Sequence, residues 1–341
     1  MIDIDISSRE TDMATPFLPR RRWLALASGM AASSIAAFPV FGQTAAFPSR
    51  PLRIIVPFAA GSGSDVFARV VGQELSEIAG QPVVIDNRVG GGGIVGTSAA
   101  AQAPADGYHL MMVANPFTIL AGITRKPPYD PLVDFAPIAK FAMVPMVLSA
   151  GPKIRFDTID QLIAYAKAHP GKLSYASSGP GTSSQILMEL FKQAASVDIV
   201  EVPYKDTSKA MLDVIGGQVD LNVAPMPMIL QHAKSGAVQP LGLFYGKRSA
   251  LLPEVPHIGE VLKFSAAPLW YGFVTSANVP PDIRARLSDM IVKATQSPKV
   301  AERFAAMGAE PVVTTNEQFV ADMKAEVADS GRIARVLGIL R

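Results

Sequence analysis

Short apolar runs alternate with amphipathic stretches in the region that follows residue 46. Residues 52–58 (LRIIVPF) are rich in β-branched side chains and end in a Gly/Ser cluster, after which residues 65–79 repeat apolar positions at helical period. The order then repeats, because the pattern predicts a strand over 83–86, a helix over 95–103 after four glycines, and a strand over 108–114. Such alternation predicts parallel βαβ units.

A second region repeats this design after a strand predicted over residues 141–149, whose proline, Pro145, makes it a candidate for the segment that crosses between the two regions. The predicted helices of the second region cover 158–169, 185–195 and 208–215, and its predicted strands cover 173–176, 199–202, 219–223, 240–244 and 270–275. Two helices end the chain, 281–296 with Pro281 in its first turn and 316–337 with Asn316 as N-cap. The sequence predicts an α/β fold in two parts.

Each part contains a strand that runs into a Gly/Ser loop and then a helix. In the first loop, Ala60, Gly61 and Ser62 offer backbone N–H groups at a helix start, and Asp65 is placed to cap that helix. The second loop, 177–184 (SSGPGTSS), adds hydroxyl groups to such N–H groups. Two such loops facing each other would form a cleft suited to an anion, whereas ordinary helix capping is the alternative for either loop alone.

The first 46 residues have the pattern of an export signal instead of a folded segment. Three consecutive arginines, 20–22, precede Trp23 and Leu24, and the moderately apolar run 23–41 is diluted by Ser and Gly before small residues near a cleavage site between Gly42 and Phe47. Paired arginines before an aromatic residue and Leu indicate the twin-arginine route. A transmembrane anchor is the alternative, which the Ala/Ser/Gly content disfavours.

Composition narrows the function classes. The chain has 341 residues, 49% of them hydrophobic and 18% charged, so it can bury the cores of about two domains. A formal net charge of +2 gives no electrostatic case for nucleic acid, and the absence of Cys removes disulfides, thiolate nucleophiles and Cys-based zinc sites.

Few residues point to catalysis. The four histidines are scattered without metal-binding spacing, and no G-x-S-x-G motif occurs. Residues 61–63 (GSG) begin like a dinucleotide fingerprint, but Val66 stands where the third glycine belongs. We expect no enzyme, no cofactor and no metal, and an exported enzyme with a nucleotide cofactor is the less favoured alternative.

Nine motifs in sequence order resemble those of one family. They are VPFAAGSGSD (56–65), NRVGGGGIVG (87–96), DGYHL (106–110), YDPLVDF (129–135), YAKAHPGKLSYASSGPG (165–181), VPYK (202–205), GGQVD (216–220), KRSALLPEVP (247–256) and WYGFV (270–274). Together they identify the chain as similar to the solute receptors of tripartite tricarboxylate transporters, the Bug-type extracytoplasmic binding proteins. The chain departs from the family pattern at Ser62, Val89, Gln185, Glu201 and Asp206.

The resemblance implies a type II periplasmic-binding-protein fold, in which two α/β lobes joined by a hinge close on a ligand in the cleft between them. Lobe 1 would comprise 48–143 plus 270–341 and lobe 2 would comprise 144–269, with the hinge in 141–145 and 271–274. The implied function is that of a periplasmic, monomeric receptor that delivers a small organic acid to the large and small transmembrane subunits of a transporter. A ligand-sensing receptor that serves a signalling partner is the alternative.

The family's ligand loops correspond to residues 58–65 and 177–183 of this chain. The residues expected to bind the ligand are Phe58, Ala60, Gly61, Ser62, Asp65, Asn115, Ser177, Ser178, Gly179, Thr182, Ser183, Tyr204 and Asp206. Because neither loop contains Lys or Arg, we expect N–H groups and hydroxyls to hold the carboxylate, with Lys205 as the nearest cationic alternative. Ser62 and Asp206 leave the class of acid open, since Asp206 could repel a second carboxylate or pair with an amine.

Overall fold

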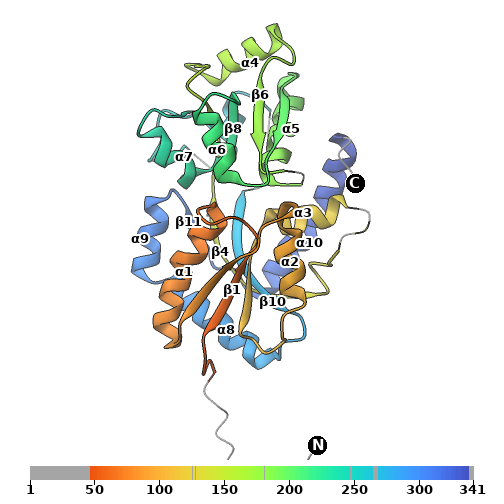
Figure 1. Ribbon diagram of the computed structural model, residues 1–341, viewed down its shortest axis with the longest axis vertical. Coiled ribbons are helices and arrows are strands. Elements are labelled where there is room, and N and C mark those ends of the chain that lie inside the picture. The colour runs from red at the N-terminus through yellow and green to blue at the C-terminus, as the bar shows by residue number, and fades with distance from the viewer. Residues whose placement is uncertain are drawn as a thin grey trace, which may run out of the picture. The chain divides into compact units, whose positions relative to one another are not determined.

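The computed structural model describes residues 47–337 apart from 125, 127, 180, 246–247 and 264–267. The predicted export signal, residues 1–46, therefore lies outside the described residues. Two β-sheets organise the described chain, one of six strands and one of five. We call each sheet with the helices that pack on it a lobe, lobe 1 for the six-stranded sheet and lobe 2 for the five-stranded one (Figure 1).

The sheet of lobe 1 has the strand order β11-β4-β10-β3-β1-β2. In that order the strands cover Glu310–Pro311, Phe135–Val144, Leu269–Ser276, His109–Ala114, Leu52–Val56 and Val83–Asn87. Strand β1 is parallel to both β2 and β3, which confirms the predicted βαβ units. Strand β10 lies antiparallel between β3 and β4.

Helices cover both faces of this sheet (Figure 1). The helices are α1 (Gly63–Ala79), α2 (Ile94–Ala101), α3 (Asn115–Ile123), α8 (Pro281–Thr295), α9 (Pro298–Ala306) and α10 (Asn316–Leu337), with a short 3-10 turn at Gly91–Gly93. Successive side chains of β1 point to opposite faces of the sheet. Ile54 belongs to the same hydrophobic cluster as Phe67 of α1, and Ile55 belongs to a second cluster with Phe319 of α10. Burial on both faces explains the continuous apolar run of β1.

Lobe 2 repeats the arrangement with the order β7-β6-β8-β5-β9. In that order the strands cover Val200–Pro203, Ser174–Ser177, Leu221–Pro225, Met146–Ala150 and Gln239–Leu243, and the helices are α4 (Ile159–Ala168), α5 (Ser183–Ala195), α6 (Thr207–Ile215) and α7 (Met226–Ala233), with a 3-10 turn at Ile258–Glu260. Strand β6 is parallel to β7 and β8, and β5 is antiparallel to β8 and β9. In each sheet, therefore, the strand that follows a crossing from the other lobe lies antiparallel inside the sheet.

The first crossing between the lobes is a single residue, Pro145, between β4 and β5. Val144 and Leu269, which the sequence assigned to lobe 2, end β4 and begin β10 in the sheet of lobe 1. Residues 271–274 lie inside that sheet, paired with both β3 and β4. The lobe bounds and the hinge remain predictions.

The observed elements differ from the predicted ones in a few places. Residues 141–149 are not one strand, because β4 begins at Phe135 and Pro145 separates it from β5. Thr315, not Asn316, caps α10, since its Oγ1 accepts a hydrogen bond from the N–H of Gln318 at 3.2 Å. Among the described residues, no helix is both long and apolar enough to cross a membrane.

Candidate functional site

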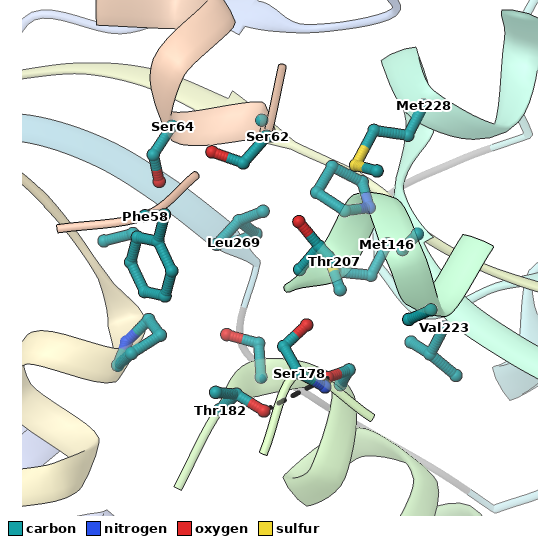
Figure 2. Close-up of a pocket in the computed structure, with 18 of the residues that line it drawn as sticks. Phe58, Ser62, Ser64, Met146, Ser178, Thr182, Thr207, Val223, Met228 and Leu269 are labelled. Atoms are coloured by element: carbon teal, nitrogen blue, oxygen red, sulfur yellow. Dashed lines mark hydrogen bonds between the residues drawn. The ribbon is translucent and has the colours of Figure 1, made fainter. Parts of the chain in front are cut away.

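A cavity of about 60 Å³ lies between the two lobes, and we call it the cleft cavity. Ser62 and Ser64 of lobe 1 lie on one side of it, and Ser178 and Thr182 of lobe 2 lie on the opposite side (Figure 2). The lining residues are Phe58, Ser62, Gly63, Ser64, Ala114, Pro116, Met146, Ser178, Thr182, Ser183, Ser184, Thr207, Ala210, Asn222, Val223, Ala224, Pro225, Met228, Leu269 and Tyr271. No residue of this described lining carries a charge.

The first turns of five helices reach the cleft cavity, those of α1, α3, α5, α6 and α7. The first backbone N–H groups of a helix have no partner within the helix, and the helix dipole places partial positive charge there. Gly63 and Ser64 occupy such positions in α1, Ser183 and Ser184 do so in α5, and Thr207 begins α6. The cavity therefore has an electropositive wall without a cationic side chain.

The loop before α1 uses its own N–H groups internally. Gly61 N–H donates to Asp65 Oδ2 at 2.9 Å and Ser62 N–H donates to Ala59 O at 3.1 Å. Ala60 and Gly61 are exposed and do not line the cleft cavity. The N–H groups of Gly61 and Ser62, which we expected to bind the ligand, are therefore used within the loop. Gly63 and Ser64, the first two residues of α1, line the cavity.

Asp65 holds this loop in place from outside the cleft cavity. Besides Gly61, its carboxylate accepts hydrogen bonds from Arg69 Nε at 2.9 Å and Asn87 Nδ2 at 2.9 Å. Burial alone would raise the pKa of Asp65, but these hydrogen bonds outweigh burial and lower it. Asp65 is thus an ionised anchor of the loop, placed behind the cavity wall.

Gly63 allows α1 to start against Tyr271. A Cβ at this position would lie 2.3 Å from the Tyr271 hydroxyl and 3.1 Å from Pro225 Cγ. The Tyr271 hydroxyl is hydrogen-bonded to Ser64, and burial raises the pKa of Tyr271, so it stays a neutral phenol. Glycine is required here by close packing at the cavity wall.

The loop before α5 is also held largely by its own hydrogen bonds. Ser177 Oγ accepts from Gly179 N–H at 3.1 Å, Ser178 N–H donates to Ser184 Oγ at 2.9 Å, and Thr182 Oγ1 donates to Gly179 O at 2.6 Å. Ser177 and Gly179 do not line the cleft cavity, whereas Ser178 and Thr182 do. Of the predicted hydroxyls in this loop, those of Ser177 and Thr182 already donate hydrogen bonds within the protein, to Glu201 and to Gly179 O.

Two buried hydroxyls of the cleft cavity are without a partner among the described residues. Ser183 Oγ and Thr207 Oγ1 are both buried and make no hydrogen bond. Buried polar groups in proteins are almost always hydrogen-bonded, so an orphan hydroxyl on a cavity wall indicates an outside partner. Sequence analysis predicted Ser183 and missed Thr207, although Thr207 directly follows a helix-capping Asp in the sequence.

Tyr204 and Asp206 support the lobe 2 side from behind. Tyr204 Oη donates to Asp213 Oδ2 at 2.8 Å, and burial together with that carboxylate raises its pKa to about 12. Asp206 caps α6, accepting from Ser208 N–H at 2.8 Å. Neither residue lines the cleft cavity, and Lys205 borders a separate small cavity beside Phe58 and Gly90.

Asn115 lies at a different cavity, of about 640 Å³, which we call the rear cavity. Its side chain accepts from Trp270 N–H at 3.0 Å and donates to Pro268 O at 3.1 Å and to Glu326 Oε1. Asn115 therefore ties α3 to the start of β10 and to α10. Its neighbours Ala114 and Pro116, not Asn115 itself, line the cleft cavity.

Comparison with known proteins identifies the fold and the family. The family model described as the tripartite tricarboxylate transporter family receptor matches residues 67–339. The chain belongs to this family. Protein BugT of Bordetella pertussis is 38% identical to the receptor over 308 residues, which cover 88% of this chain and 94% of BugT.

Solved structures agree with this assignment. The periplasmic binding protein BugD is 30% identical, with a TM-score of 0.83, and the match covers 86% of the receptor and 99% of BugD. Rpa4515 of R. palustris, solved with adipate, is 30% identical, with a TM-score of 0.82 and coverage of 86% and 98%. The predicted two-lobe periplasmic-binding-protein fold is confirmed, and the chain is a solute-binding receptor and not an enzyme.

The cleft cavity also contains residues that the sequence did not predict, because the fold brings them there from distant positions in the chain. Asn222 on β8 and Tyr271 on β10 line the cleft cavity, although neither stands in a Gly/Ser loop. Ser64 and Ser184 lie inside the predicted loops 58–65 and 177–184 but were not among the predicted site residues. Counting the first two N–H positions of each helix would have found them. No group of three or more metal-ligating side chains is present among the described residues.

Proposed function

We propose that this receptor binds a small organic acid in the cleft cavity and holds its carboxylate by neutral donors. The observation that carries this proposal is the uncharged lining onto which five helix starts converge. Helix N-termini favour anions, and charge-assisted hydrogen bonds from N–H and O–H groups are stronger than neutral ones. The relative Rpa4515 was solved with adipate, which supports a carboxylate as the ligand class.

The orphan hydroxyls of Ser183 and Thr207 fit the same ligand. Each is buried on the cavity wall, on α5 and α6 of lobe 2, while Gly63 and Ser64 face the cavity from α1 of lobe 1. A carboxylate accepts about four hydrogen bonds, so one group could join both lobes. Binding would then favour the closed arrangement of the lobes over an open one.

The test is to release and identify what the receptor carries. Protein purified without refolding is denatured, and the released small molecules are analysed by mass spectrometry, followed by calorimetric titration of stripped protein with adipate and other mono-, di- and tricarboxylates. We expect an organic acid and saturable binding of at least one carboxylate. Release of a dinucleotide, or no binding by any carboxylate, contradicts the proposal.

We further propose that the receptor is exported by the twin-arginine route and delivers its ligand, as a monomer, to the transmembrane subunits of a tripartite tricarboxylate transporter. Family membership supports the transport role, and Arg20 and Arg21 ahead of Trp23-Leu24 support the route. N-terminal sequencing of periplasmic protein should begin between residues 43 and 47, and changing Arg20 and Arg21 to Lys should block export. Periplasmic protein that begins at Met1 or Met13 contradicts the proposed signal.

A further inference from the structure

The rear cavity has the size and lining of a small-molecule site and is distinct from the cleft cavity. Its volume of about 640 Å³ is within the range of about 300–1,000 Å³ usual for ligand pockets. Ile186, Leu187 and Leu190 of α5 contribute apolar side chains from lobe 2. Ile119 of α3 and Trp270 of β10 contribute apolar surface from lobe 1.

The charges of this lining do not balance. Lys140 pairs with Asp322 at 2.7 Å, and Arg332 pairs with Asp329 at 3.1 Å. The third carboxyl, Glu326, has no cation within ion-pair distance among the described residues. The described lining therefore carries three carboxyl groups and two cations.

Glu326 is the deepest of these acids. It accepts hydrogen bonds from Trp270 Nε1 at 3.0 Å, from Asn115 Nδ2 and from Thr118 Oγ1, all of them neutral donors. Burial raises the pKa of Glu326 more than these hydrogen bonds lower it. The residue is nevertheless only half-buried, because it borders the rear cavity, so a molecule in that cavity can reach it.

An unpartnered hydroxyl also borders the rear cavity, and it is one that the cleft cavity shares. Ser183 is 9% exposed, its Oγ makes no hydrogen bond, and it lines the rear cavity as well as the cleft cavity. The rear cavity thus combines apolar walls, a carboxyl without a cation and a free hydroxyl. These three features suit a molecule with an apolar body and a positively charged, hydrogen-bonding end.

We propose that the rear cavity binds an organic ammonium with an aliphatic or aromatic body. The ammonium group lies against Glu326 and balances the charge of the lining, and the body packs on Ile186, Leu187 and Leu190. An organic anion would add to the excess negative charge, and an inorganic cation would leave the apolar walls uncovered. Of the described residues this site shares only Ser183 and Leu269 with the cleft cavity, and its attraction for a cation comes from Glu326, which does not line the cleft cavity.

Trp270 provides a direct reporter, because it is the only tryptophan among residues 47–341. Its fluorescence is followed while hexylammonium, hexanoate or hexanol is added to protein that begins at residue 47. We expect a saturable change with hexylammonium, at least tenfold weaker binding of the other two, and a gain of about fourfold in affinity per added methylene of the alkylammonium. Adipate should not displace hexylammonium. Hexanoate binding as tightly as hexylammonium overturns the proposal.

Glu326→Gln removes the charge at nearly constant size. With its amide oxygen in the place of Oε2 it still accepts hydrogen bonds from Trp270 Nε1 and Thr118 Oγ1, and only the bond from Asn115 is lost. Hexylammonium affinity should fall about ten- to a hundredfold, whereas hexanol affinity should stay unchanged. Glu254→Gln is the matched control: it makes the same change at an exposed acid that does not line the rear cavity and should change affinity less than threefold. Equal affinity of Glu326→Gln and wild type overturns the proposal.

A measurement on the unmodified protein covers the case in which Glu326→Gln does not fold. Affinity for hexylammonium should decline as pH falls through the pKa of Glu326, since protonation removes the charge that attracts the ammonium. Lys140, whose charge acts to lower the pKa of Glu326 against the effect of burial, also borders the cavity, as do Asp322, Asp329 and Arg332. A flat hexylammonium profile between pH 4 and 8 overturns the proposal.

Discussion

The two loops that face the cleft cavity have similar sequences but are held in place by different chemistry. In lobe 1 the acid behind the loop, Asp65, is paired with Arg69 at 2.9 Å. In lobe 2 the corresponding acid is Glu201, which accepts from Ser177 Oγ at 2.6 Å and from Gln185 Nε2 at 3.0 Å. The first loop is anchored by an ion pair and the second by neutral donors.

This difference explains two departures from the family pattern. Gln185 and Glu201 are two of the positions at which the chain departs from the family pattern, and the structure shows that they contact each other. Gln185 Oε1 also accepts from Gly181 N–H at 2.8 Å. The two departures therefore form one hydrogen-bonded unit that supports the lobe 2 loop, so we expect them to act together and not as separate changes of ligand class.

We expect the largest effect from a substitution of Gly63, at the lobe 1 side of the cleft cavity. Gly63→Leu places side-chain atoms where the Tyr271 hydroxyl and Pro225 lie, so we expect adipate affinity to fall more than a hundredfold and the free energy of unfolding to fall by about 1–3 kcal/mol. Titration calorimetry and urea unfolding measure the two effects. Gly80→Ala, at the other end of α1 with open space around its Cβ, should cost about 1 kcal/mol of stability and leave binding unchanged.

Removing the charge of the two anchoring acids should sharpen the contrast between the loops. Asp65→Asn loses an ion pair and charge-assisted hydrogen bonds, so we expect the free energy of unfolding at pH 7 to fall by about 3 kcal/mol. Glu201→Gln retains an acceptor for neutral donors and should cost about 1 kcal/mol. Equal losses for the two variants in urea unfolding contradict the distinction.

The stability that Asp65 contributes should depend on pH. The pKa of Asp65 is lowered from its ordinary value of 3.8, so its ionised form contributes stability that is present above that value and lost as pH falls through the lowered pKa. The stability difference between wild type and Asp65→Asn should therefore shrink on acidification below about pH 4. A difference that stays constant down to pH 2 rules out Asp65 as an ionised anchor.

A smaller effect is expected from the hydroxyls of lobe 2. Ser183→Ala and Thr207→Ala remove orphan hydroxyls, so each should weaken adipate binding by about tenfold, equivalent to about 1.5 kcal/mol. Thr182→Ala removes a hydroxyl that already donates to Gly179 O and should weaken binding less than threefold. Calorimetry of the three variants tests this order, and a larger loss for Thr182→Ala than for the other two reverses our assignment.

The smallest effect concerns the cationic alternative. Lys205 is exposed and does not line the cleft cavity, so Lys205→Ala should change adipate affinity less than twofold at about 0.15 M salt. Loss of adipate binding in this variant would contradict our assignment, because it would show that an ion pair with Lys205, and not a set of neutral donors, holds the carboxylate.

Local patterns in the sequence predicted most of the fold, since the main strands and helices appear close to their predicted bounds. The helices α3, α7 and α9 were missed because each combines Pro in its first turn with a length of only eight or nine residues. The predicted helix α8 also begins with Pro, but it has 15 residues over which the helical period shows. The residues that line the cleft cavity lie within one or two positions of predicted ones in both loops, and their contact with a ligand stays a prediction. The offset arose because hydrogen bonds within each loop decide which N–H groups remain free.

Long-range contacts account for the rest of the site. Asn115 was expected at the ligand, but its partners Pro268, Trp270 and Glu326 stand more than 150 positions away in the sequence. The lobe 2 strand β8 contributes Asn222 to the cleft cavity in the same way, through sheet order alone. No local pattern carries this information.

The most direct test of the central claim is a crystal structure of the receptor with adipate. The account predicts a carboxylate in the cleft cavity with its oxygens about 2.7–3.1 Å from donors at Gly63 or Ser64 in lobe 1 and at Ser183 and Thr207 in lobe 2, with no cationic side chain in contact. A carboxylate bound to Lys205, or bound outside the cavity that the five helix starts surround, would contradict it.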